Sequence, residues 1–205
     1  MSSQSEYSLT NLDKLYKQFN SLLQLKDDTK CINFLDKYSD FCDTQCTYTK
    51  LTPLMCACNE DNDQIALYLV DKCKNLNRQN KFGFTDLMYA ICKYMNAVIY
   101  KILSHDINMN LRTYSNYCRS NCSAFQIACD IDKNDIAIKI MERGYIFVDE
   151  DWEYIKRNAY ILSHIRTVYR ITMQSAMDDE SHVMGQCFKT TYVSQLVNII
   201  CGFII

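Results

Sequence analysis

The sequence predicts an all-α fold, an α-solenoid of stacked helix-turn-helix units joined by short finger loops. Three observations predict it. Glycine and proline are scarce, with 4 and 1 in the whole chain, which disfavours turn-rich all-β folds. A block of sequence that begins at Thr52 begins again at Thr85, a period of about 33 residues that is typical of helical repeat arrays. Within each block the apolar residues follow helical spacing.

The composition is that of an ordinary globular protein. The chain is 48% apolar and 22% charged, which excludes a wholly disordered chain. Its length is sufficient for one domain with a sizeable core. There are 22 basic and 24 acidic residues, for a net charge of -2. Because a nucleic-acid binder usually shows a basic excess or a basic patch, we expect no nucleic-acid partner.

Three copies of a helix-forming block carry the repeat. They are Thr52–Cys58, Thr85–Ile91 and Ser123–Cys129, and the third follows the second at a longer interval than the second follows the first. A second apolar block follows each copy in the same register, in the order Ile65–Val70, Val98–Leu103 and Ile136–Met141. Asn77 and Asn110 keep the shorter interval, so the five extra residues lie between Asn110 and Ser123.

The residue types in these blocks suit helix starts and close helix packing. Thr52 and Thr85 are expected to cap their helices by accepting backbone N–H groups, and Pro53 suits the first helical position. Each unit has too small a core to stand alone and must stack on its neighbours. We therefore expect seven apolar side chains to be buried between units: Leu54, Ala57, Leu69, Leu87, Ala90, Ile102 and Ala128.

The blocks resemble the ankyrin repeat. Thr52-Pro53-Leu54 with Ala57 matches the family's T-P-L-H-x-A motif, except that Met55 replaces the histidine. The second copy also lacks the proline, and the third is more divergent. Asn77 to Gly83 resembles the family's N-x-x-D-x-x-G finger tip, with Asn80 in place of the aspartate. The resemblance covers about residues 28–148. The alternative is a non-repetitive helical bundle with chance periodicity.

The register predicts five parts of the chain. These are a disordered N-terminus (1–8), a degenerate N-terminal capping repeat (9–38), the repeat array (39–148, with units near 52–84, 85–122 and 123–148), a C-terminal helical cap (149–177), and a linker with an apolar tail (178–205). The final segment, Thr190 to Ile205, carries no charge but is too short to span a membrane. We interpret this tail as packing on an apolar end of the stack. A dimer or partner contact and a tail anchor are the alternatives.

The twelve cysteines predict thiols rather than a disulfide scaffold. Met1 to Ser8 has no apolar segment typical of a secretory signal. Cys56, Cys58, Cys92 and Cys129 lie inside helical patterns, where they serve as small buried apolar side chains. A reducing compartment and a cytoplasmic protein are therefore expected. The high usage of Ile, Asn, Lys and Tyr is typical of an A+T-rich genome, such as that of a large DNA virus or a protist. The host cytoplasm is the expected location for a viral protein.

The sequence lacks the residue patterns of a catalytic, cofactor or metal site. None of the three histidines is paired in sequence with a nucleophile, as nucleophilic catalysis requires. No glycine-rich phosphate-binding motif is present. Cys42 with Cys46, and Cys118 with Cys122, are half-sites for zinc, but stacking separates them by about 20 Å. We expect no enzyme activity, no cofactor and no bound metal.

The resemblance implies a non-catalytic protein-protein interaction module, a scaffold or adaptor whose partner binds to the finger and first-helix face. A host-interaction role would follow for a viral protein. The alternative is a structural or membrane-associated subunit that acts through the apolar tail. Tyr and Arg dominate binding energy at buried interfaces. The matching finger positions, and hence the candidate partner-binding residues, are Tyr48, Lys50, Arg78, Lys81, Phe82, Arg112, Tyr114 and Tyr117.

Overall fold

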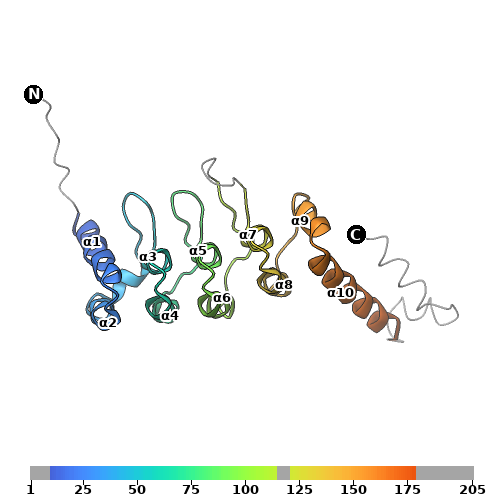
Figure 1. Cartoon of the computed structure of the whole chain (residues 1–205), viewed down its shortest axis with the longest axis horizontal. Coiled ribbons are helices and arrows are strands. Elements are labelled where there is room, and N and C mark those ends of the chain that lie inside the picture. The colour runs from blue at the N-terminus through green and yellow to red at the C-terminus, as the bar shows by residue number, and fades with distance from the viewer. Residues whose placement is uncertain (1–9, 115–120, 179–205) are drawn as a thin grey trace, which may run out of the picture.

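The computed structural model describes residues 10–114 and 121–178, and within these ranges the chain is helical with no strand. Two rows of helices run along the stack, and three finger loops point away from the row that contains α3, α5 and α7 (Figure 1). The elements are α1 (Asn11–Gln24), α2 (Asp28–Lys37), the 3-10 helix η1 (Ser39–Asp43), α3 (Pro53–Asn59), α4 (Asp63–Lys72), α5 (Asp86–Cys92), α6 (Asn96–Leu103), α7 (Ala124–Asp130), α8 (Asn134–Glu142), α9 (Asp151–Arg157) and α10 (Ala159–Asp178).

Stacking joins equivalent helices of successive units. In the first row α3 packs against α5 and α5 against α7, while in the second row α4 packs against α6 and α6 against α8. Helices α1 with α2, and α9 with α10, form pairs at the two ends. This is the predicted α-solenoid, and it excludes the non-repetitive bundle. Residues 1–8 and the segment Thr190 to Ile205 lie outside the described residues, and the predicted division into five parts stays a prediction.

Side-chain caps start the first helix of each central unit, and those at Thr52 and Thr85 confirm the prediction from the sequence. Thr52, Thr85 and Ser123 accept from the backbone N–H groups of Met55, Met88 and Gln126, respectively. Pro53 occupies the first turn of α3, where its missing N–H has no partner to lose. Each of the three repeated blocks therefore begins a helix, and a side-chain hydrogen bond fixes the residue at which that helix starts.

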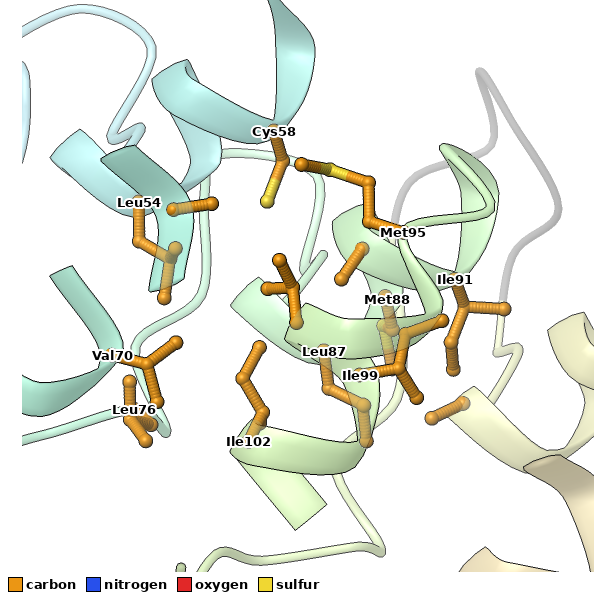
Figure 2. Close-up of a cluster of buried hydrophobic side chains, with 14 of the residues drawn as sticks. Leu54, Cys58, Val70, Leu76, Leu87, Met88, Ile91, Met95, Ile99 and Ile102 are labelled. Carbon is orange, nitrogen blue, oxygen red and sulfur yellow. The ribbon is translucent and has the colours of Figure 1, made fainter. Parts of the chain in front are cut away.

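The core lies between the two rows and between successive units. Figure 2 shows Leu54 and Cys58 of α3 facing side chains of α5 and α6, among them Leu87 and Ile102. The seven predicted residues are all buried, the most exposed of them being Leu87 at 3%. Every residue of α3 from Pro53 to Cys58 is buried. The stack is thus held mainly by apolar burial between neighbours.

Polar links repeat between the units as well. The side-chain oxygens of Asp43, Asn77 and Asn110 accept the backbone N–H groups of Lys74, Asn108 and Ile146, at 2.7–2.8 Å. Each acceptor belongs to one unit and each donor to the next. The regular spacing of Asn77 and Asn110 in the sequence therefore reflects a repeated hydrogen bond.

The cysteines differ from the sequence prediction at one position. Cys56, Cys58 and Cys129 are buried, but Cys92 is exposed. Cys92 is the last residue of the short helix α5, so it lies past the part of the helix that neighbours cover. Seven cysteines of the described residues are free thiols, namely Cys31, Cys42, Cys46, Cys56, Cys58, Cys73 and Cys129. Burial raises the pKa of Cys56 to about 12, so this thiol stays protonated.

Among the described residues, no helix combines the length and apolar character that crossing a membrane requires.

Asp86 is a buried carboxyl group at the position that Pro53 holds in the preceding unit. The Thr52 hydroxyl donates a hydrogen bond to it, so the carboxyl links α5 to the cap of α3. Burial raises the pKa of Asp86 to about 7, although the Thr52 hydrogen bond and the Arg78 guanidinium act in the opposite direction. The folded protein therefore binds this proton more tightly than the unfolded chain does.

We expect Asp86 to make stability pH-dependent. The pKa of Asp86 is about 7 in the folded state against an ordinary 3.8. The stability that the folded protein gains by holding this proton is therefore fully present below pH 3.8 and is lost as pH rises through about 7. The protein should melt at a higher temperature near pH 5.5 than near pH 8, as differential scanning calorimetry measures. Asp86→Asn keeps the acceptor for Thr52 and should reduce this difference. An equal difference in both proteins would contradict the assignment.

Candidate binding surface on the finger loops

Three loops form the surface, which we call the finger row: finger 1 (residues 44–51), finger 2 (77–84) and finger 3 (110–122, described except for 115–120). Each finger turns at a residue with left-handed backbone, namely Lys50 (φ 56°), Gly83 (φ 86°) and Asn121 (φ 60°). Lys50 and Gly83 are separated by the same interval as Thr52 and Thr85, whereas Asn121 follows Gly83 at a longer one. The five extra residues therefore lie within finger 3.

Hydrogen bonds join adjacent fingers directly. The Lys81 N–H donates to the Thr49 carbonyl at 3.1 Å, and the Tyr114 N–H donates to the Phe82 carbonyl at 3.2 Å. Two glutamines at equivalent positions add a second set of links. Gln45 Nε2 donates to the Gln79 carbonyl at 2.9 Å, and Gln79 Nε2 donates to the Arg112 carbonyl at 2.9 Å. The finger row is therefore one connected ridge.

Asn80 organises finger 2 from within. Its buried side-chain oxygen accepts the N–H groups of Phe82 and Phe84, and its Nδ2 donates to the Tyr89 hydroxyl at 3.0 Å. Its own carbonyl accepts the Tyr114 hydroxyl at 2.7 Å. The residue that replaces the family's aspartate thus fixes the turn through an amide, which supplies a donor that a carboxylate lacks.

Gly83 allows fingers 2 and 3 to touch. A Cβ at this position would lie 2.7 Å from a Tyr114 ring carbon and 2.8 Å from Thr113 Cα and the Tyr114 nitrogen. Its positive φ also disfavours any residue with a side chain. The contact therefore requires glycine for both reasons.

We expect Gly83→Ala to destabilise the protein by about 2 kcal/mol or more, because backbone strain and a steric clash add. Gly144→Ala is the matched control, since Gly144 has a similar φ of 90° and nothing within 4 Å of the added methyl group. The Gly144→Ala variant should lose only about 1 kcal/mol of stability, which is the cost of placing a residue with a side chain in left-handed backbone. Chemical denaturation of both variants compares them. Equal losses would contradict the contact between the fingers.

Four of the predicted partner-binding residues are exposed to solvent. Tyr48 is 67% and Tyr114 61% exposed, and Lys50 and Lys81 are also exposed. Phe82 is half-buried beneath the Lys81 ammonium group, which lies 4.8 Å from its ring centre. Tyr117 lies outside the described residues.

The two predicted arginines are less exposed than the predicted tyrosines and lysines that the structure describes. Arg78 is half-buried, and its Nε is buried without a hydrogen-bond partner among the described residues. Its charge partly opposes the burial that raises the pKa of Asp86. Arg112 was expected to reach a partner from an exposed loop, and this expectation needs correction. Its side chain is 17% exposed and forms an ion pair with the fully buried Asp151, at 3.3 Å. It also donates to Tyr145 and to the Asn121 carbonyl, at 2.7 and 2.9 Å.

Arg112 thus connects finger 3 to the start of α9. The Asp151 carboxylate also accepts the Tyr145 hydroxyl and the Val148 N–H, at 2.8 and 2.9 Å. The sequence analysis missed Tyr145 and Asp151. One signal was available, because Gln45, Gln79, Arg112 and Tyr145 recur at nearly constant intervals of one repeat, which marks Arg112 as a link between units rather than a free finger residue.

The finger row is cationic in a chain with slight negative charge. The three fingers contain no aspartate or glutamate in their sequences. Elsewhere lysines pair across units, as Lys93 does with Asp61 and Lys101 with Asp71. In the part of the chain that the structure describes, neither Lys50 nor Lys81 has a carboxylate within ion-pair distance. Their charges are available to a ligand.

Within residues 10–114 and 121–178, no group of three or more His, Cys, Asp or Glu side chains is placed to hold a metal ion. Of the two predicted half-sites, Cys42 is buried and Cys46 half-buried. Cys118 lies outside the described residues.

Part of the chain is similar to a known family. Residues 22–113 match a family model described as ankyrin repeats (3 copies). The matched range runs from within α1 to finger 3, so it includes part of the predicted capping repeat and ends before Ser123. No curated protein matches the chain.

Proposed function

Because residues 22–113 belong to the ankyrin-repeat family, whose members are protein-protein interaction modules, we propose that this chain is a non-catalytic scaffold or adaptor that binds another protein through its finger row. The observation that carries the proposal is a connected ridge whose exposed side chains, Tyr48, Lys50, Lys81 and Tyr114, have no packing role in the core.

Rigidity favours binding by this ridge. Backbone hydrogen bonds between fingers hold the backbone that carries the exposed side chains in place before a partner arrives. A surface ordered in advance loses less conformational entropy on binding. Exposed tyrosines supply large contact areas with few rotatable bonds.

The positive charge of the ridge indicates which kind of protein surface would bind to it. Lys50 and Lys81 have no carboxylate partner among the described residues, and the fingers contain no acidic residue. Complementary charge steers association and selects among partners. The partner is therefore a protein that presents carboxylates beside apolar groups. A cytoplasmic location agrees with the seven free thiols named above, since thiols persist in reducing compartments.

A triple substitution tests the proposal. A partner captured from an extract of the native host and then purified would be titrated with the protein in a calorimeter. Tyr48→Ala, Lys50→Ala and Lys81→Ala together should weaken binding at least tenfold, about 1.4 kcal/mol, because exposed aromatic and cationic side chains dominate such interfaces. The melting temperature should change little, since the three side chains are exposed.

The matched control is Tyr100→Ala, Lys72→Ala and Lys139→Ala, which removes the same residue types from the second-helix side, on α6, α4 and α8. It should leave the affinity unchanged. If this set abolishes binding and the finger set has no effect, the partner binds the second-helix side.

A further inference from the structure

An apolar groove lies at the end of the stack opposite to α1. Its volume is about 200 Å³, and α8, the loop that follows it, α9 and α10 line it. We call it the α10 groove, and its lining residues are Met141, Glu142, Phe147, Trp152, His164, Ile165, Val168 and Tyr169. The Trp152 and Phe147 rings stack within it at 6.0 Å between centres.

The apolar stripe of α10 extends beyond the helices that cover it. Ile161 and Ile165 are buried, at 0% and 5% exposure, where α10 packs on α8 and α9. Farther along the helix, Val168 is 48%, Tyr169 44% and Ile171 62% exposed. Figure 1 shows this part of α10 running away from the α8 and α9 helices. Contiguous exposed apolar surface of this kind marks a contact site.

The chain itself carries an uncharged segment that follows α10 in the sequence. Residues 179–205 follow α10, and Thr190 to Ile205 contain no charge. The groove residues His164 to Tyr169 lie about 13–21 Å from the end of α10, at roughly 1.5 Å per residue. The stretch from 179 to 189 can span about 36 Å when extended. The connecting stretch is therefore long enough for the uncharged segment to reach the groove.

We propose that the segment from Thr190 to Ile205 docks in the α10 groove and covers Trp152, Val168 and Tyr169. A tethered segment binds as an intramolecular ligand at high effective concentration, so modest apolar contact suffices. The docked segment closes the open end of the stack, as terminal caps of repeat arrays do. It leaves the finger row free, so this contact is independent of the proposed function.

Trp152 reports on the contact because it is the only tryptophan in the chain. In the full chain, Leu196→Asp with Ile200→Asp should release the segment, because charged groups resist apolar burial. Tryptophan emission should move to longer wavelength, and acrylamide quenching should increase about twofold as the ring loses its cover. Ser194→Asp with Asn198→Asp adds the same charge at polar positions and should change both signals less. Far-UV circular dichroism should be the same for all of these proteins.

A substitution in the groove tests the same contact from the other side. Val168→Asp should increase quenching as the segment variant does, and the two combined should give no further increase, because they break one contact. Additive effects would overturn the proposal. So would a segment variant whose quenching equals that of the unsubstituted protein.

Two further results would assign the groove to another occupant and overturn the proposal. The first is protection of Trp152 that depends on protein concentration and accompanies a dimer in sedimentation. The second is a Trp152 emission that moves to shorter wavelength when phosphatidylcholine vesicles are added to the unsubstituted chain.

Discussion

Ala90→Lys should destabilise the protein by about 4 kcal/mol, because it places an unpaired charge in a closely packed seam. Ala90 lies in α5, has no exposed surface, and α5 packs against α3, α6 and α7. A loss of this size is a large fraction of the stability of a typical domain, which is about 5–15 kcal/mol. Urea denaturation followed by circular dichroism measures it.

Ala97→Lys is the matched control for this change. Ala97 is one helix further along, in α6, and its side chain is exposed, so the same substitution should alter stability by less than about 0.5 kcal/mol. Should Ala90→Lys melt like the unsubstituted protein, the units do not stack through α5.

Arg112→Ala should cost about 3–5 kcal/mol, because it leaves the buried Asp151 carboxylate without its cation. The variant also loses the hydrogen bonds from the guanidinium to Tyr145 and the Asn121 carbonyl. Thermal denaturation measures the loss. Arg157→Ala removes an arginine from a solvent-exposed pair with Glu153, in which the side chains are 79% and 64% exposed, and should cost less than about 0.5 kcal/mol.

A second substitution separates the charge from the lost contacts. Asp151→Asn, introduced into the Arg112→Ala variant, removes the uncompensated charge and should restore part of the stability. If the double variant is no more stable than Arg112→Ala alone, the ion pair does not hold finger 3 to α9.

The predictions that succeeded from sequence depend on local rules. Thr52 and Thr85 are caps because the hydroxyl and the N–H that it accepts lie within one helical turn. Ala57 and Ala90 are buried because small residues recur at the spacing of packed helices. Repetition then multiplies each local signal, so the stack follows from a few residues per unit.

The predictions that failed depend on contacts outside the repeat. Arg112 was predicted to be an exposed residue of finger 3 because its ion-pair partner, Asp151, lies far along the chain in a pair of helices without the T-P-L signature. Cys92 was predicted to be buried because it lies inside a helical pattern, but it is the last residue of α5 and is exposed. Spacing predicts which face of a helix a residue occupies, whereas the end of a helix and the path of a loop depend on the neighbouring units.

Amide hydrogen exchange of the protein, free and bound to its purified partner, tests the central claim most directly, because it maps the contact without any substitution. Binding through the finger row should slow exchange in residues 44–51 and 77–84 and leave α4, α6 and α8 unchanged. Protection confined to α4, α6 and α8, with no change in these two fingers, would contradict recognition by the finger row.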